Sequence, residues 1–579
     1  MIEAKRVPYG VSDFLRVIRE NQYYVDKTMY IPLLEAQPDN LIFIRPRRFG
    51  KSLFLSMLEA YYDCKLKDQF QEIFGGLWIG SQPTPQQGKY QVLTLDFSQV
   101  GGNIDNLEER FNSYCNICFD AFINRYAQFY DETTRKAVLA EDVASNKLAT
   151  IQKYAKEQNY QLYLIIDEYD NFTNTVLNEQ GEEVYHAMTH ASGFYRDYFK
   201  KFKGSFAKIF MMGVSPVTLD DVTSGFNIGW HISTKPEFDK MLGFSTEDVR
   251  AMFTRYRDAG QIPADSNIEA MIEEIKPWYD NYCFAEEEYG KTTMYNSVMV
   301  LNFLDKYIRN NYDIPKNMVE SNVRIDYDKV RMLIRHDKEF THDASIIQQL
   351  VTQGFVTGKL VENFPAERIN DPDNFLSLLF YFGMVTIDGD YKGATKFIIP
   401  NEVVRDQMYT YLLDTYKEND LTYDSFNKGK LESQLAYDGN YKAYFEFIAD
   451  SLKRYSSQRD KQKGEAFVHG FTLAMTSQNQ FYRPISELDN DGGYADIFLS
   501  PLCDIYKDMV DSYIIELKYC KTNTADEQLQ VLFKEASAQI CRYANSDIVK
   551  ESVKTTKLHK LVVIYRGAEM VMCEEVTEK

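Results

Sequence analysis

The chain has 579 residues, a formal net charge of −20 at pH 7 and eight cysteines. This length accommodates roughly three or four structural units, and the acidic balance argues against a surface coated with nucleic acid. Eight cysteines are too sparse for a disulfide scaffold in so long a chain, so the composition favours a reducing cytoplasm.

Residues 45–52 read Arg-Pro-Arg-Arg-Phe-Gly-Lys-Ser, which is typical of a phosphate-binding loop with arginine in place of the usual first glycine. In such loops backbone N–H groups surround the β-phosphate, the lysine reaches the β and γ oxygens, and the hydroxyl binds Mg²⁺. Apolar residues 41–44 predict a buried strand before it, and helical spacing from Leu53 predicts a helix after it. A basic surface turn that happens to contain Gly-Lys-Ser is the alternative. The residues expected to bind nucleotide are Arg45, Arg47, Arg48, Phe49, Gly50, Lys51 and Ser52, with Ser52 also on the metal.

Two later apolar runs end in residues suited to nucleotide chemistry. Residues 162–166 predict a buried strand that ends in Asp167 and Glu168, the Walker B arrangement of P-loop ATPases. Asp167 is expected to hold Mg²⁺ through water and Glu168 to polarise the attacking water, although a strand end followed by a polar turn gives the same pattern. Residues 209–214 form the next strand, after which Ser215 is either a sensor of the γ-phosphate or an ordinary strand terminator before proline.

Four segments together resemble a known family. They are Tyr-Val-Asp-Lys-Thr at 24–28, the loop at 45–52, Val-Leu-Thr-Leu-Asp-Phe-Ser at 92–98 and Asp-Glu-Tyr-Asp at 167–170. They look like the predicted AAA-type ATPase domain found mainly in bacterial proteins, in which the Arg-Pro-Arg-Arg-Phe-Gly-Lys-Ser loop is the usual form. The resemblance implies a parallel-sheet domain, here residues 1–240, that binds and hydrolyses ATP.

Residues 241–440 are expected to form a connecting region. Ser245 is a helix N-cap followed by acidic residues, which predicts a helix through Tyr256. Segments 278–282 and 295–297 also resemble the family, but Asn281 stands where the family has Gly and Ser297 where it has Pro. Both departures concern turns, so we expect them to affect local geometry more than activity.

The second half of this region predicts a winged-helix-like module. Residues 375–382 predict a helix, and residues 384–387 and 396–399 predict a hairpin with its turn at 388–390. A further helix follows from Val403. Such modules bind DNA in some proteins and pack against neighbours in others, and the few basic residues here favour packing.

Two short patterns have the residue types of metal sites but incomplete spacing. Cys115 and Cys118 form a lone CxxC, and no second pair lies at zinc-finger spacing, so helix-interior cysteines are the better interpretation. His186 and His190 share a predicted helix face without the glutamate at 187 that a zinc protease motif needs.

The second chemical centre lies near the C-terminus. Asp496 opens a predicted strand, and Glu516 and Lys518 lie two apart on another, so that both point to one side while Ile515 and Leu517 face the core. If the two strands pair, two carboxylates and an ammonium converge. Such a trio can hold Mg²⁺, polarise a phosphodiester and orient a water molecule.

The neighbouring elements extend this pattern. A helix at 464–475 carries Glu465, a later helix carries Gln539 and Tyr543, and residues 561–565 predict a buried strand. This order resembles the PD-(D/E)XK nuclease superfamily and its C-terminal α/β restriction-endonuclease-like domain, here residues 441–579. The resemblance implies that Asp496 and Glu516 ligate metal, that Lys518 positions the water, and that Glu465 and Gln539 assist. A structural ion cluster without turnover is the alternative.

The sequence thus predicts an α/β protein of the cytoplasm, with ATP, Mg²⁺ and, at the nuclease site, Mg²⁺ or Mn²⁺ as cofactors. The expected activity is an ATPase joined to a DNA nuclease, with defence or mobile-element biology as the setting by analogy. A nucleotide switch or scaffold with a silent nuclease-like domain is the alternative.

Residues 375–387 are too short for a membrane span, and residues 1–6 lack the apolar core of a signal peptide. A basic stretch could contact phosphate or simply be a solvated helix face: Lys453, Arg454, Arg459, Lys461 and Lys463.

Overall fold

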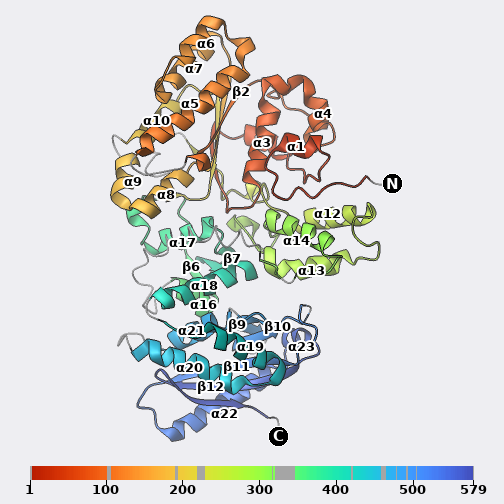
Figure 1. Ribbon diagram of the computed structural model, residues 1–579, viewed down its shortest axis with the longest axis vertical. Helices are drawn as coiled ribbons and strands as arrows, with labels where there is room; N and C mark the ends of the chain where they lie inside the picture. The colour runs from red at the N-terminus through yellow and green to blue at the C-terminus, as the bar shows by residue number, and fades with distance from the viewer. Residues whose placement is uncertain are drawn as a thin grey trace. The chain divides into compact units, whose positions relative to one another are not determined.

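The computed structural model divides into two compact units (Figure 1). Within the described residues, the first unit contains residues 3–313 and 357–401, and the second contains residues 346–356 and 402–577. The structure describes residues 3–100, 106–189, 193–217, 229–315, 317–319, 346–418, 421–457, 464–477, 479–490, 493–503 and 505–577. The three-part division at residues 240 and 440 stays a prediction.

A five-stranded parallel sheet forms the centre of the first unit, in the order β2-β3-β4-β1-β5. Its strands are apolar runs that are buried along nearly their whole length, as expected when helices cover both faces. Strand β4 lies between β1 and β3, so the loop after β1 and the acids after β3 open at the same sheet edge as the end of β4. The bounds are β1 Asn40–Ile44, β2 Gln91–Asp96, β3 Leu162–Asp167, β4 Lys208–Gly213 and β5 Trp230–His231.

Helices pack around this sheet, and α5 illustrates why they form. Its buried residues Phe111, Cys115, Phe119 and Phe122 recur every three or four positions and so line one face. Cys115 therefore lies in a helix interior, as predicted, and α5, α6 and α7 group beside β2 (Figure 1). The bounds are α1 Phe14–Arg19, α2 Tyr30–Glu35, α3 Lys51–Tyr62, α4 Phe70–Phe74, α5 Leu107–Arg125, α6 Glu132–Leu139, α7 Ala144–Glu157, α8 Asn171–Gln180, α9 Glu182–Thr189 and α10 Phe194–Phe202.

Three further helices follow the sheet in the same unit. The predicted N-cap is confirmed, because Ser245 and Asp248 form a capping box at the start of α12. Asn281, where the resembling family has Gly, adopts a φ of 78°, a left-handed conformation that asparagine tolerates better than most residues. The bounds are α12 Thr246–Asp258, α13 Ile268–Tyr279 and α14 Ser297–Arg309.

The winged-helix-like module has the predicted helix and hairpin, but its turn lies elsewhere. Lys392 and Gly393, both with positive φ, form the two-residue turn between β7 and β8, whereas Gly389 lies at a register shift within β7. The prediction of a turn at 388–390 was wrong, because Asp388 and Gly389 look like turn residues but here form a bulge. The bounds are β6 Phe355–Gly358, α17 Pro372–Tyr381, β7 Thr386–Tyr391 and β8 Ala394–Ile398, in the sheet order β6-β8-β7.

The second unit is built on a mixed sheet in the order β13-β12-β11-β10-β9. Only β11 and β12 are parallel, and the other neighbours are antiparallel. On one face α22 packs on β11 and β12, with Phe498, Ile514, Val562 and Ile540 in the shared core. The strand bounds are β9 Tyr482–Asn490, β10 Gly493–Pro501, β11 Asp511–Cys520, β12 Lys557–Arg566 and β13 Glu569–Glu575.

The remaining helices complete this unit. They are α16 Ile346–Gln353, α18 Glu402–Glu418, α19 Ser425–Asp438, α20 Tyr441–Ser457, α21 Glu465–Ser477, α22 Asp526–Tyr543 and α23 Asp547–Val553. The two sheets with their helices confirm the predicted α/β class: a parallel P-loop sheet, a connecting region and a C-terminal mixed sheet. None of the helices among the described residues is both long enough and apolar enough to cross a membrane.

Candidate active sites

The loop at 45–52 joins β1 to α3, as the sequence predicts. Gly50 has a φ of 89° at the N-cap of α3, a left-handed conformation that glycine adopts without steric cost. Arg48 also has positive φ, at 68°. A left-handed residue beside a right-handed one turns neighbouring backbone N–H groups toward one side, which is how loops form anion sites at a helix N-terminus.

Lys51 and Ser52 are held by protein groups in this structure. The Nζ atom of Lys51 donates to the carbonyls of Arg45 and Pro46 at 3.0 and 2.9 Å, and burial lowers the pKa of this ammonium. The Ser52 hydroxyl donates to Oδ2 of Asp167 at 2.5 Å. The Ser52 hydroxyl and Asp167, the last residue of β3, are thus brought together across the end of β4.

Arg45 points away from the phosphate concavity, which corrects the expectation that it adds charge there. Its guanidinium donates to the carbonyls of Ser233 at 2.6 Å and Phe238 at 3.1 Å, and it stacks over Phe284 with its Cζ atom 4.0 Å from the ring centre. The residue is 1% exposed, and burial lowers its pKa to about 10, although the negative charge of Asp239 acts to raise it. Arg45 therefore anchors the loop, because a buried cation needs partners and here carbonyls accept from its two terminal nitrogens, while Nε has no partner among the described residues.

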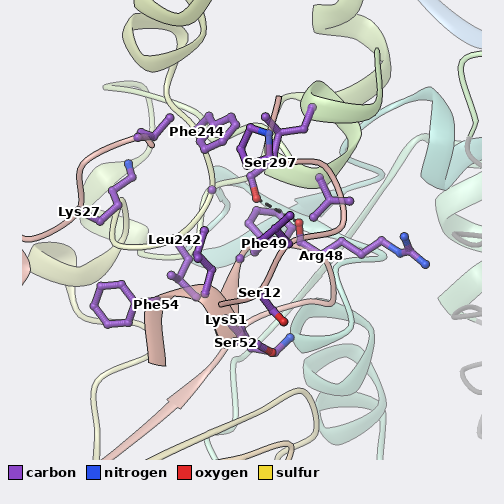
Figure 2. Close-up of a pocket in the computed structure, with 18 of the residues that line it drawn as sticks. Ser12, Lys27, Arg48, Phe49, Lys51, Ser52, Phe54, Leu242, Phe244 and Ser297 are labelled. Atoms are coloured by element: carbon purple, nitrogen blue, oxygen red, sulfur yellow. Dashed lines mark hydrogen bonds between the residues drawn. The ribbon is translucent and has the colours of Figure 1, made fainter. Parts of the chain in front are cut away.

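The other loop side chains also reach outward. Arg47 donates to Oδ1 of Asn171 at 3.3 Å, and the Arg48 guanidinium extends away from Lys51 and Ser52 in Figure 2. The Phe49 ring is buried edge-on against Tyr282. All three residues line the neighbouring cavity, so they border the nucleotide site even though their side chains contact other parts of the protein.

The residues that follow β3 and β4 occupy the same end of the sheet. Burial raises the pKa of Asp167 to about 6, and the hydrogen bond from Ser52 opposes this shift. Glu168 has a φ of 47° and lines the cavity. Ser215 is fully buried, its N–H donates to Asp170 at 2.6 Å and its hydroxyl accepts from the N–H of Val217 at 3.3 Å. Ser215 thus lies beside the predicted phosphate site but is engaged with local backbone.

A cavity of about 380 Å³ opens beside the loop (Figure 2). Lys51, Ser52 and Glu168 line one part, and residues from distant segments line the rest. The sequence analysis missed these residues, apart from the 24–28 segment that carried the family resemblance. One of them, Lys27, forms an ion pair with Asp248 at 2.9 Å. The missed lining residues include Ser12, Met241, Leu242, Phe244 and Leu301.

The C-terminal carboxylates come together on adjacent strands. Ile497 pairs with Ile515, and continuing this antiparallel register places Asp496 opposite Glu516. The Oδ2 atom of Asp496 accepts from the N–H of Leu517 at 2.7 Å, and Lys518 Nζ lies 2.7 Å from Oε1 of Glu516. The structure therefore brings the predicted trio into one cluster.

Glu516 is the most perturbed acid of this cluster. It is 2% exposed, and burial followed by the nearby charge of Asp496 raises its pKa to about 7 against the stabilising ammonium of Lys518. Burial lowers the pKa of Lys518, but Glu516, Asp496 and Glu465 outweigh this effect and raise it overall. The second oxygen of Glu516, Oε2, is buried and has no hydrogen-bond partner among the described residues.

The proposed assisting residues approach from two helices. Glu465 begins α21, is exposed, and is close enough for its charge to act on Lys518. Gln539 lies on α22, one turn before Tyr543. The charges of Glu516 and Asp496 contribute to raising the pKa of Tyr543. The Oε1 atom of Gln539 is buried and has no hydrogen-bond partner among the described residues. The sequence analysis missed His469, one turn after Glu465, whose Nε2 atom lies 3.0 Å from the carbonyl of Asp496.

Comparisons with known proteins identify both regions. Residues 8–223 match the model of the predicted AAA-ATPase family, and residues 463–575 match the model of the PD-(D/E)XK nuclease superfamily. The chain joins a predicted AAA-ATPase domain to a PD-(D/E)XK nuclease-superfamily domain. The loop at 45–52 and the acids after β3 lie in the ATPase domain, and the carboxylate cluster lies in the nuclease-superfamily domain.

Two individual proteins are also similar to this chain. One is the "Uncharacterized protein in vnfD 5'region" of Azotobacter chroococcum mcd 1, which is 24% identical over 289 residues. That match covers 49% of this chain and 49% of the relative, so it spans about half of the relative's length. The other is the ORC2 protein of Aeropyrum pernix, solved as ADPNP-ADP complexes, with 11% identity and a TM-score of 0.31 over 69% of this chain and 98% of that one. A likeness at that score carries no argument about function.

The carboxylates of the nuclease-superfamily domain fit a divalent ion that is held partly by the protein and partly by water and substrate. Among the described residues no group of three or more His, Cys, Asp and Glu side chains is arranged as a metal cage. Mg²⁺ is commonly bound by one or two carboxylates together with water and substrate phosphate, and Asp496 and Glu516 supply two carboxylates with one unpartnered oxygen.

The basic stretch before this domain is described in part. Lys453 pairs with Glu569 at 3.0 Å, and both side chains are well exposed, which favours the solvated-face interpretation for that residue. Arg459, Lys461, Lys463 and, in the ATPase domain, His190 lie outside the described residues.

Proposed function

We propose that the protein binds and hydrolyses ATP in its N-terminal domain and cleaves DNA in its C-terminal domain with Mg²⁺ or Mn²⁺. We further propose that nucleotide state controls cleavage, in the cytoplasm, in defence against foreign DNA or in mobile-element biology. The matches to a predicted AAA-ATPase and to a nuclease superfamily support the two activities separately. Their presence in one chain supports the link between them.

In the ATPase half, the loop N–H groups would receive the phosphates and Lys51 would turn from the Arg45 and Pro46 carbonyls to the β and γ oxygens. Ser52 and Asp167 would hold Mg²⁺, which lowers the charge repulsion on the phosphates when bound. Glu168 would orient the attacking water from the cavity wall. The base and ribose would occupy the rest of the 380 Å³ cavity.

In the nuclease half, Asp496 and Glu516 would hold the divalent ion. That ion, when bound, polarises the scissile phosphate and makes a bound water more acidic. Lys518, held 2.7 Å from Glu516, would position this water and accept no proton while it stays an ammonium. Glu465 and Gln539 would assist from α21 and α22.

The observation that carries the nuclease proposal is Glu516. A buried carboxylate with an unpartnered oxygen is costly unless something charged meets it, and the raised pKa near 7 records that cost. A divalent ion at Oε2 would satisfy the oxygen and restore the ionised form. Strongly perturbed acids cluster at functional sites, and structural ion-pair networks also perturb pKa values.

The alternative is a nucleotide switch or scaffold whose nuclease-like domain does not cut. Two contacts favour it, because Oδ2 of Asp496 already accepts from Leu517 and Oε1 of Glu516 already meets Lys518. A cluster whose members are partly paired with one another in this way resembles a structural ion network.

A cleavage assay separates the two functions. Supercoiled plasmid is incubated with the full-length protein and Mg²⁺ or Mn²⁺, with and without ATP, and we expect nicking in the unmodified protein. Asp496→Ala and Lys518→Ala should each lower the rate by at least about 100-fold. Intact plasmid under every condition would reject the nuclease proposal in favour of the switch.

Matched controls keep this result specific. Asp526→Ala removes an aspartate of the same domain whose side chain is 83% exposed, and Lys442→Ala removes an exposed lysine paired with Glu574. Both controls should cut at the unmodified rate. A similar loss in the controls would mean that general charge, and not the cluster, governs cleavage.

A further inference from the structure

Three consecutive carbonyls of the nucleotide loop are held by residues from far along the chain. The N–H of Gly243 donates to Phe49 O at 3.1 Å. The N–H of Val298 and the hydroxyl of Ser297 both donate to Arg48 O, each at 3.2 Å. The side-chain amide of Asn296 donates to Arg47 O at 3.4 Å. We call Gly243 and residues 296–298 the loop clamp.

These bonds determine which way the loop peptides face. In a trans peptide the C=O and the following N–H point in opposite directions. When the clamp holds the carbonyls of Arg47, Arg48 and Phe49, the N–H groups of the residues that follow them must turn to the other side of the loop. That is the arrangement in which loop N–H groups surround an anion.

Side chains reinforce the same attachment. Phe49 packs edge-on against Tyr282 and Phe284, with ring centres 5.0 and 5.5 Å away. A Cβ added at Gly383 would lie 2.8 Å from Pro46, so the loop also passes closely over the winged-helix-like module of its own unit. The side chains that replace the usual loop glycine and its neighbours therefore serve as outward anchors.

The clamp is also part of the wall of the cavity. Gly243 and Ser297 line it together with Phe244 and Leu301, from the segment before α12 and from α14. Figure 2 labels Ser297 and Phe244 among them. The dashed line in Figure 2 is the bond from Ser297 to the Arg48 carbonyl. A nucleotide in the cavity would therefore contact the same residues that shape its phosphate site.

We infer that the loop clamp positions the phosphate-binding loop in place of the missing glycine, and that nucleotide binding and the order of the 243–301 segment stabilise each other. This inference rests on the proposed binding of ATP in the cavity. Because linkage is reciprocal, a loosened clamp weakens ATP binding by the same factor by which ATP tightens the clamp.

Gly243→Ala on the full-length protein tests the clamp, with Gly260→Ala as its control. Gly243 has a φ of 87°, and an added Cβ would lie 2.9 Å from Tyr295 O and 3.0 Å from the Phe49 ring. Gly260 has a φ of 71° with nothing within 4 Å of an added Cβ, so it shares the backbone strain without the contact. In a titration with a fluorescent ATP analogue and Mg²⁺, we expect about 10-fold weaker binding for Gly243→Ala and a change below about 2-fold for Gly260→Ala.

A side-chain variant keeps the test decisive if Gly243→Ala does not fold. Asn296→Ala combined with Ser297→Ala removes two donors to the loop but keeps the Val298 N–H, and we expect about 5-fold weaker binding. Hydrogen exchange should show that the ATP analogue protects the amides of Gly243 and Val298 in the unmodified protein and not in Lys51→Ala.

The outcomes separate the two proposals. No ATP binding by the unmodified protein would reject the proposed function itself. Binding by the unmodified protein with equal affinity in the folded clamp variants, or with no protection at Gly243 and Val298, would reject the clamp and leave the ATP site standing.

Discussion

The two candidate sites of this chain hold their charges in opposite ways. At the nucleotide loop the lysine and the hydroxyl already have protein partners: Lys51 donates to two loop carbonyls, and Ser52 donates to Asp167. At the carboxylate cluster, Glu516 keeps one buried oxygen without a described partner and has a pKa raised to about 7. The nucleotide loop would have to break internal hydrogen bonds to accept a ligand. The carboxylate cluster, in contrast, has a buried oxygen that a ligand could meet directly.

This contrast indicates what each ligand contributes. ATP bound at the proposed site would have to replace hydrogen bonds of similar strength, so part of its binding energy would be used to rearrange Lys51 and Ser52. A divalent ion at Glu516 would relieve a cost already present in the folded protein. We therefore expect a nucleotide to switch the first site and a metal to stabilise the second.

The largest expected effect is that of Lys51→Ala on ATP affinity. The substitution removes the ammonium that would reach the β and γ oxygens and leaves the two buried carbonyls of Arg45 and Pro46 without this donor. We expect affinity to fall about 1,000-fold in calorimetric titration, and Lys65→Ala, which removes a lysine outside the loop, should bind normally. Unchanged affinity in Lys51→Ala would mean that the loop is not the nucleotide site.

The next effect concerns pH and the free energy of unfolding without metal. The folded pKa of Glu516 is raised above its ordinary value, so its stabilising contribution is complete below about pH 4.5 and is lost as pH rises through about 7. The free energy of unfolding of Glu516→Gln, relative to that of the unmodified protein, should rise by up to about 3 kcal/mol as the pH goes from 4.5 to 8. Urea unfolding in the presence of a chelator measures this difference. A difference between the two proteins that does not change with pH would show that Glu516 is not strained in this way.

Metal binding in the absence of nucleotide gives a smaller contrast between the sites. Oε2 of Glu516 has no partner among the described residues, whereas Asp167 already accepts a hydrogen bond from Ser52. Glu516→Gln should therefore weaken Mn²⁺ binding by about 50-fold, and Asp167→Asn by less than about 3-fold. Isothermal titration measures both, with Asp526→Asn as an exposed control. Equal losses in the two variants would mean that the two sites hold metal equally well without nucleotide.

The smallest effect is expected for Ser52→Ala without nucleotide. Asp167 loses the hydroxyl that opposes the rise of its pKa, so the protein should lose about 1 kcal/mol of unfolding free energy at pH 8 and less at pH 5, where the acid is protonated. Ser81→Ala, in an exposed position, serves as the control in the same denaturation series. A loss that is equal at both pH values would show that the bond does not depend on the charge of Asp167.

Local patterns were sufficient to predict most elements. The strands at 40–44, 162–167 and 208–213 and the cap at Ser245 follow from apolar runs and capping chemistry that neighbouring residues determine. The hairpin turn was misplaced because Asp-Gly at 388–389 and Lys-Gly at 392–393 both suit positive φ, and only the pairing of β7 with β8 decides between them.

The candidate sites show the same difference between local patterns, which can be read from the sequence, and long-range contacts, which cannot. Asp496, Glu516 and Lys518 could be grouped from strand periodicity, and Ser52 and Asp167 from motif order. The direction of Arg45 could not be predicted, because its acceptors at Ser233 and Phe238 lie 188 and 193 positions away in the sequence. The cavity wall at Met241 to Phe244 was missed for the same reason, since nothing local marks an apolar segment as the lining of a ligand site.

The buried guanidinium of Arg45 also limits how this loop can change. An arginine that satisfies carbonyls of Ile44, Ser233 and Phe238 from inside the core cannot be exchanged for the glycine of the common motif without leaving those acceptors and a large void behind. An engineer who restores the consensus there would damage the domain while appearing to repair it. The route between the two forms of the loop therefore requires coordinated changes at several distant positions.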